Sequence, residues 1–212
     1  MTVQTVSDRV CAIVGVEPPM DISTDTTENG LRLKAMMQMA GDEIARRFDW
    51  RELITTASKG PGSQFDLPTD FERTIDGAAV RDAQTPFTVY KGSLSDSEWL
   101  MVQATTPAAS RKYYRLSAGA KIDISIPLTG SNTLNFTYVS KNWLINGATT
   151  KSEIANKDDT ARFPERLLEK NLIWRWRRQA GLGYQDELSE FEADLLSMSK
   201  TDRGSHLLSG GG

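Results

Sequence analysis

The sequence predicts an α+β protein: helices from both ends of the chain form a bundle, and a β-rich region is inserted between them. Helical periodicity is confined to residues 1–50 and 151–200, whereas residues 51–150 carry short β-branched or aromatic runs separated by turn residues. No terminal helix can bury its apolar stripe alone, so the two ends of the chain must meet in space. Residues 201–212 leave the helical pattern and are expected to form a C-terminal arm.

Two helices are predicted in the first 50 residues. The first has an apolar face and is ended by Gly15 and by the prolines at 18 and 19. That face carries Val3, Val6, Val10, Ile13 and Val14. The second begins near Glu28 and runs for about 20 residues as an amphipathic helix. Its methionines at 36, 37 and 39 could form an adaptable binding surface, but packing in the core is the favoured interpretation.

The middle of the chain is predicted to be a set of short strands with one helix. The clearest strand covers 121–126, where isoleucines alternate with polar residues, so one face is expected to be buried and the other exposed. Further runs of strand character are 51–56, 87–90, 113–116 and 133–139. Ser95 has the position of an N-cap before a short helix over 95–102.

The C-terminal part predicts an antiparallel helical hairpin. The third helix opens at Phe163-Pro164-Glu165, and Gly181-Leu182-Gly183 separates it from the fourth. Residues 162–178 carry six basic and two acidic side chains, and 184–194 carry five acidic ones. One interpretation pairs these charges within the hairpin.

A second interpretation gives the third helix two partners. Its apolar residues fall on two separate arcs of a helical wheel, one with Leu168, Leu172, Ile173, Trp176 and Ala180, the other with Phe163, Leu167 and Trp174. The bundle could cover both arcs, or one arc could contact another copy of the chain. Such a contact would be heterologous and could close into a ring.

Composition excludes several classes of function. The chain of 212 residues has a net charge of −3 and no apolar run of the length of a membrane span, and its first residues do not resemble a signal peptide. One cysteine, Cys11, and one histidine, His206, exclude an intrachain disulfide and a Cys/His zinc site. Cys11 lies on an apolar helical stripe, where an inert thiol is expected. We expect no metal and no cofactor.

Two other functions remain as alternatives. A carboxylate-dependent nuclease or hydrolase could use the acids at 66, 70, 72 and 76 or the pair Asp158-Asp159, although turn formation and helix capping explain these residues more simply. Trp174-Arg175-Trp176-Arg177-Arg178 could contact nucleic acid. A pI of about 5.3 is far below that of a dedicated DNA-binding domain, which leaves non-specific contact.

Three stretches resemble the head-to-tail adaptors of tailed bacteriophages, also called head completion or connector proteins, of the group that includes tail tubular protein A. They are Leu67-Pro68-Thr69-Asp70-Phe71-Glu72-Arg73, the run from Phe163 to Leu182, and the run from Tyr184 to Glu192. The plan of terminal helices around a β-rich insert agrees with that family. A tail terminator or a minor tail protein is the alternative of similar size.

The resemblance implies a structural virion protein at the head–tail interface, assembled in the host cytoplasm, and not an enzyme. Such adaptors form a ring, expected here to be a 12-mer, that binds the portal protein, receives a downstream tail or stopper protein and lets DNA pass. It implies portal binding by the arm residues Arg203, His206, Leu207 and Leu208. It also implies subunit contacts by Arg166, Lys170, Trp174, Trp176 and Arg177. No membrane contact is expected.

Overall fold

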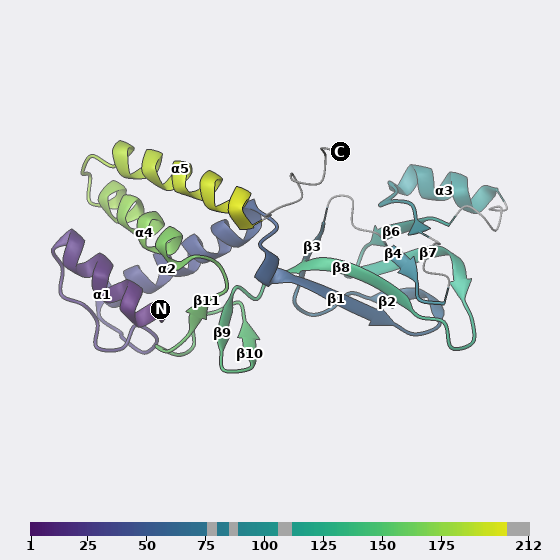
Figure 1. The fold of residues 1–212 in the computed structure, drawn as a ribbon, viewed down its shortest axis with the longest axis horizontal. Helices are drawn as coiled ribbons and strands as arrows, with labels where there is room; N and C mark the ends of the chain where they lie inside the picture. Colours follow the sequence, from purple (N-terminus) through teal and green to yellow (C-terminus); the bar gives the residue numbers. More distant parts are fainter. Residues whose placement is uncertain (76–79, 85–88, 106–111, 203–212) are drawn as a thin grey trace, which may run out of the picture. The chain divides into compact units, whose positions relative to one another are not determined.

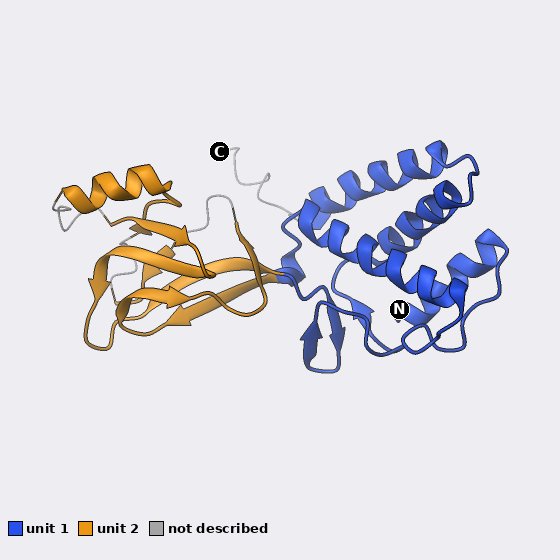
Figure 2. Ribbon diagram, turned by 180° about the vertical axis from the view of Figure 1, so that it is seen from behind, with its two compact units in different colours: residues 1–53, 141–212 blue, residues 54–140 orange. Residues whose placement is uncertain are grey.

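The structure, a computed structural model, describes residues 1–75, 80–84, 89–105 and 112–202 (Figure 1). It is an α+β fold, as predicted, and its contacts divide the chain into two compact units (Figure 2). Unit 1 comprises Met1–Leu53 and Lys141–Gly212, and unit 2 comprises Ile54–Ser140. Across the described residues, no helix is both long enough and apolar enough to cross a membrane.

Unit 1 is a bundle of the four terminal helices, which brings the two ends of the chain together as expected. They are α1 (Val3–Val14), α2 (Glu28–Arg47), α4 (Glu165–Gln179) and α5 (Gln185–Asp202). The side chains of Thr2 and Thr27 cap α1 and α2, and Gly15 ends α1 with a φ of 75°, which favours glycine. Helix α4 packs against α1, α2 and α5, so it is the centre of the bundle.

An aromatic cluster joins the helices of unit 1 to its small antiparallel sheet. The sheet contains β9 (Leu144–Asn146), β10 (Thr149–Lys151) and β11 (Thr160–Ala161). Phe163 lies 6.0 Å from Trp50 and 5.8 Å from Trp143, measured between ring centroids. Both tryptophans are fully buried, and the short 3-10 turn η1 (Arg51–Leu53) follows Trp50.

Unit 2 contains two antiparallel sheets and one helix. The larger sheet comprises β1 (Ile54–Lys59), β3 (Phe71–Thr74), β4 (Val80–Asp82), β5 (Val89–Tyr90) and β8 (Leu134–Ser140), with β8 at its centre. The smaller sheet has the order β2 (Gly62–Asp66), β7 (Lys121–Leu128), β6 (Tyr114–Ser117). Their apolar side chains form one core that includes Tyr90, Ile122, Phe136 and Tyr138. Helix α3 (Asp96–Ala104) lies beside the smaller sheet (Figure 1).

The structure differs from the sequence predictions at several boundaries. Unit 2 is shorter than the predicted insert of 51–150, because η1 and the β9–β10 hairpin belong to unit 1. Helix α5 continues to Asp202, two residues into the predicted arm. On β7, Asp123 is buried although its face was expected to be exposed. Of the run 87–90, residues 87 and 88 lie outside the described residues.

Candidate interaction surfaces

The charges of α4 and α5 pair with one another across the hairpin. Arg166 and Lys170 of α4 lie 3.1 and 2.8 Å from Oδ2 of Asp194, and Arg177 lies 2.7 Å from Oε1 of Glu187. Residues later in α4 pair with residues earlier in α5, so the two helices are antiparallel. The hydrogen bond to Asp194 is the main reason that the pKa of Lys170 is raised. The structure thus supports the intramolecular interpretation of these charges.

The tryptophans of α4 are covered within unit 1. Trp174 and Trp176 are only 7% and 9% exposed, and Leu167 and Leu168, one from each predicted arc, are fully buried. Trp174 packs 6.4 Å from the ring of Tyr184. Of the two interpretations of the apolar arcs, the structure therefore favours the one in which the bundle covers both, and the surplus of apolar surface that a second partner would need is not found on these residues. Subunit contact by Arg166, Lys170, Trp174, Trp176 and Arg177 stays a prediction without that support, and the four predicted portal-binding residues lie outside the described residues.

A small groove lies between α2 and α4, and we call it the α2–α4 groove. It has a volume of about 290 Å³ and is lined by Met36, Met39, Trp174, Arg175, Arg178 and Gln179. Met39 is 57% exposed, and Nε1 of Trp174 is buried without a hydrogen-bond partner among the described residues. The groove therefore has an apolar lining next to a polar group that is not satisfied.

Two arginines line the α2–α4 groove, and only one of them lacks an acidic partner among the described residues. Arg175 lies over the ring of Trp174 at 4.8 Å and donates to Glu43 at 2.6 Å. Arg178 is exposed, lies 5.9 Å over the ring of Tyr184, and has no ion pair with any residue that the structure describes. Sequence reasoning treated the methionines of α2 as core, and only Met37 is fully buried. No periodicity shows that Met39 would lie beside Trp174.

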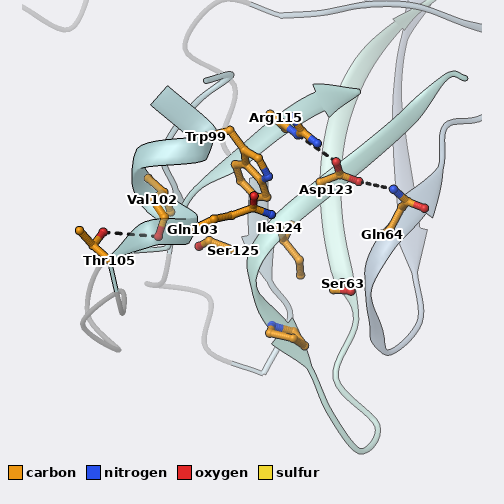
Figure 3. A pocket seen from close by; sticks show the side chains of 11 residues that line it. Ser63, Gln64, Trp99, Val102, Gln103, Thr105, Arg115, Asp123, Ile124 and Ser125 are labelled. Atoms are coloured by element: carbon orange, nitrogen blue, oxygen red, sulfur yellow. Dashed lines mark hydrogen bonds and ion pairs between the residues drawn. The ribbon is translucent and has the colours of Figure 1, made fainter. Parts of the chain in front are cut away.

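Unit 2 carries a larger groove between α3 and the smaller sheet (Figure 3). It has a volume of about 720 Å³, and its walls come from α3, β2, β6 and β7. Trp99 fixes α3 to the sheet: it is 4% exposed and has the guanidinium of Arg115 5.0 Å from its ring. The indole thus supplies the apolar attachment that a short helix needs.

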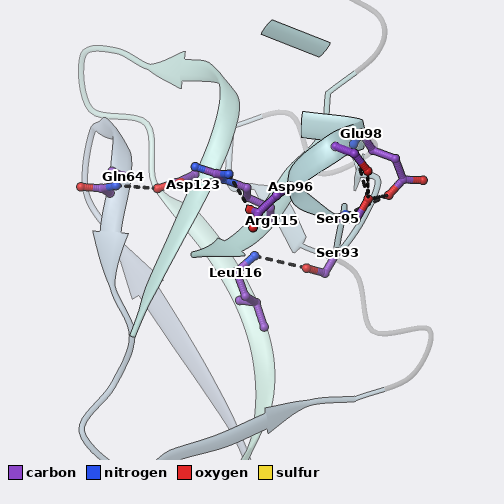
Figure 4. Close-up of polar contacts among 9 residues, drawn as sticks. Gln64, Ser93, Ser95, Asp96, Glu98, Arg115, Leu116 and Asp123 are labelled. Carbon is purple, nitrogen blue, oxygen red and sulfur yellow. Dashed lines mark hydrogen bonds and ion pairs between the residues drawn. The ribbon is translucent and has the colours of Figure 1, made fainter. Parts of the chain in front are cut away.

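A chain of polar contacts crosses this groove (Figures 3 and 4). Nε of Arg115 donates to Asp123 at 2.9 Å, and Nε2 of Gln64 donates to the other carboxylate oxygen at 2.7 Å. Nη1 of Arg115 also donates to Asp96 at 2.9 Å. Burial opposes ionisation of Asp123, but the hydrogen bonds from Gln64 and Arg115 outweigh burial and hold its pKa below the ordinary value. These partners explain why a carboxylate lies buried on β7.

Helix α3 presents apolar side chains to solvent as well as to the sheet. Ser95 and Glu98 form a reciprocal capping box at its N-terminus (Figure 4). Leu100 and Met101 are 65% and 71% exposed. We call Asp96, Glu98, Leu100 and Met101 the α3 outer face. A helix that is apolar on opposite sides is typical of one that is covered on both.

Two of the carboxylates considered for catalysis, Asp70 and Asp159, have structural partners. Asp70 accepts hydrogen bonds from the hydroxyls of Tyr138 at 2.8 Å and Ser140 at 2.7 Å. Asp159 is fully buried and accepts from the backbone N–H groups of Ala155 and Asn156. Asp76 lies outside the described residues. Within the described ranges, no cluster of three His, Cys, Asp or Glu side chains has a geometry that could hold a metal ion.

Comparison with known proteins agrees with the architecture. A search of curated proteins finds no match to the chain. The family described as SU10 adaptor protein matches residues 1–209. This match includes the helices of unit 1, the β-rich insert, and the hairpin whose sequence carries the resemblance stated above. Because the match spans nearly all of the 212 residues, the chain belongs to the SU10 adaptor protein family, and the predicted resemblance to phage head-to-tail adaptors is confirmed.

Proposed function

We propose that this adaptor forms a ring on the portal of a phage head, joins the portal to the next tail component and continues the channel through which DNA passes. The observation that carries the proposal is the family match over residues 1–209. The expected copy number is twelve, as the resemblance to phage adaptors implies. Such a protein acts by contact with other proteins and not by chemistry on a substrate.

Two features of the chain support this role. Residues 203–212 follow the end of α5 and contain a basic residue and two adjacent leucines, Arg203, Leu207 and Leu208, which suit insertion into a groove of another protein. The net charge of −3 suits a conduit, since an acidic lumen repels the phosphate backbone and lets DNA slide without specific binding. The arm and His206 within it are the proposed portal-binding segment.

The experiment is electron microscopy of the purified protein mixed with the portal protein of the same phage. The proposal expects a second ring stacked on the portal. Failure of the two proteins to associate at any concentration would contradict it. A ring that binds only the end of an assembled tail would favour a tail terminator instead.

Deletion of residues 203–212 tests the arm. The deletion begins after Asp202, whose Oδ2 accepts a hydrogen bond of 2.7 Å from the backbone of Arg51, so α5 keeps its last described contact. We expect an unchanged melting temperature and loss of portal attachment. Deletion of 209–212 alone is the control, because it keeps Arg203, His206, Leu207 and Leu208. A large fall in melting temperature with attachment intact would show that the segment belongs to the fold.

The nuclease alternative has its own measurement. It predicts magnesium-dependent cleavage of DNA that is lost in Asp70→Ala. The hydrogen bonds that Asp70 accepts from Tyr138 and Ser140 predict a different result: the wild type does not cleave DNA, and Asp70→Ala is less stable than the wild type.

A further inference from the structure

The α3 outer face and the α2–α4 groove both expose apolar side chains, and they carry opposite charges. We propose that the α3 outer face of one copy docks into the α2–α4 groove of a second copy. This inference rests on the proposed ring, and it names the surfaces through which neighbouring subunits meet. The occupant of the groove is thus a second copy of this chain.

The apolar parts of the two surfaces match. Leu100 and Met101 project from α3 with most of their surface in solvent, while Met39 is 57% exposed at the edge of the groove. Leu31, 53% exposed, lies two helical turns before Met39 on α2 and extends the apolar strip. The groove volume of about 290 Å³ far exceeds the share of one water molecule, ~30 Å³, so it has room for side chains.

The charges of the two surfaces are opposite. Asp96 and Glu98 stand at the N-terminus of α3, and the Asp96 side chain is 88% exposed even with its contact to Arg115. The groove carries Arg178, which has no ion pair with any described residue, whereas Arg175 beside it is already paired with Glu43. Opposite charges around an apolar centre favour one partner and one orientation.

The other acidic helix of the chain is a poorer occupant. On α5, Glu187, Glu190 and Asp194 already pair with the cations of α4, and Glu192 pairs with Arg47. Asp96 and Glu98 of α3 also have partners, Arg115 and Ser95, so the two helices differ mainly in the exposed apolar side chains that stand beside the acids. Helix α3 brings two exposed acids together with two large exposed apolar side chains, which α5 does not combine at one place.

The proposed contact has the symmetry that a ring needs. It joins two different surfaces, so each copy offers one to the preceding subunit and the other to the following subunit. Heterologous contacts of this kind close into rings when the rotation allows it. Arg178 in the groove is also of a residue type that is enriched among those that dominate the free energy of protein contacts.

The first test traps the contact with single cysteines on separate chains. Leu100→Cys and Met39→Cys proteins are mixed and oxidised, both free at high concentration and assembled on the portal. Because each chain carries one new thiol, a Leu100–Met39 disulfide can only join two copies. Native Cys11 is buried, and burial raises the pKa of its thiol, so it does not compete.

The control replaces Met39→Cys with Leu196→Cys, which is 51% exposed on α5 of the same unit. We expect a covalent dimer from the Leu100 and Met39 pair and at most a tenth of that yield, roughly, from the control pair. Equal yields, or no dimer in either condition, would overturn the inference.

The second test exchanges charge. Met101→Lys places a cation opposite Arg178, and Arg178→Glu removes the cation from the groove. Each of these two variants, tested by itself, is expected to weaken association about tenfold. A mixture in which the lysine of one variant meets the glutamate of the other should recover association, with circular dichroism showing that both variants fold. Absence of recovery counts against the contact.

The two proposals fail separately. A ring on the portal without the trapped dimer would overturn the α3 contact and keep the adaptor role. A trapped dimer from a protein that never associates with the portal would overturn the adaptor proposal and keep the contact.

Discussion

The indole of Trp143 lies directly against the backbone of Gly41 on α2, and its Nε1 donates a hydrogen bond of 2.9 Å to Asp42. A Cβ atom at position 41 would lie 2.2 Å from Cζ2 of that ring. Trp143 is fully buried and stacked on Phe163, so it has no space to move away. This contact ties the second helix to the segment in which the chain returns to unit 1.

Gly41→Ala is therefore expected to destabilise unit 1 by about 1–3 kcal/mol, because the added methyl group overpacks a filled core. The measurement is urea unfolding followed by tryptophan fluorescence. Gly183→Ala is the matched control, since a Cβ there meets nothing within 4 Å. Equal stability of the two variants would show that the indole can shift at little cost.

The close approach of Gly41 and Trp143 marks the limit of what the sequence could predict. Helical periodicity identified α1, α2, α4 and α5 with boundaries close to those observed, because each repeats apolar residues at helical spacing, and glycine or proline marks the ends of α1 and α4. Strands β2, β3, β4, β9, β10 and β11 were missed. Each is short and shows no clear alternation: β9 and β10 pair locally in a hairpin, and the others form by pairing with strands more distant along the chain.

At the candidate surfaces, too, the sequence predicted what depends on local signals and missed what depends on contacts between distant residues. The charge pattern of α4 and α5 predicted a hairpin, because complementary charges on neighbouring helices are a local signal. The cover over Trp174 comes from Tyr184 and from α2, about 135 residues away, so a helical wheel could not reveal it. Buried Asp123 likewise depends on Gln64 and Arg115, which lie on two other strands.

Asp159 is expected to stabilise unit 1 in a pH-dependent way. Burial opposes its ionisation, but hydrogen bonds from Lys151, Asn146 and two backbone N–H groups outweigh burial, so its pKa is lowered. A lowered pKa in the folded state gives stability that is present above the unfolded value, about 3.9, and is lost as the pH falls below it. Asp159→Asn should cost at least about 2 kcal/mol at pH 7, because Lys151 and the N–H groups lose a charged acceptor.

The measurement compares urea unfolding of the wild type and Asp159→Asn between pH 7 and pH 3. The difference in unfolding free energy should shrink toward acid, since protonation removes the charge from the wild type as well. Asp158→Asn, at the exposed neighbouring position, should leave the stability within about 0.5 kcal/mol. A difference that stays constant with pH would contradict the role of the charge.

Tyr90 should make unit 2 sensitive to alkali. Burial of its ring, with a smaller contribution from the charge of Asp82, raises the pKa of Tyr90 to about 12. An unfolded tyrosine ionises near pH 10, so the unfolded state releases this proton first and stability falls as the pH rises from about 10 to 12. Absorbance of tyrosinate should show a late titration that is missing in Tyr90→Phe.

The Tyr90→Phe protein is also the control for stability. In the wild type, the hydroxyl of Tyr90 donates one long hydrogen bond of 3.3 Å to the carbonyl of Ile126. Removing it should therefore lower the unfolding free energy at pH 7 by about 1 kcal/mol or less. Above pH 10 the variant should lose less stability than the wild type. Identical alkaline profiles would mean that another group controls the transition.

Trp174 separates a role in the fold from a role in assembly. The side chain is 7% exposed and packs against Tyr184, so Trp174→Ala should cost about 3–5 kcal/mol of unfolding free energy. Trp174→Phe should cost much less, because Nε1 has no hydrogen-bond partner among the described residues and an aromatic ring still fills the site. Chemical unfolding of both variants, followed by portal-dependent ring formation, gives the two readouts. If the groove receives α3, Trp174→Phe folds and assembles, whereas Arg178→Glu folds equally well and assembles poorly. If Trp174→Phe unfolds as readily as Trp174→Ala, the core requires the indole itself.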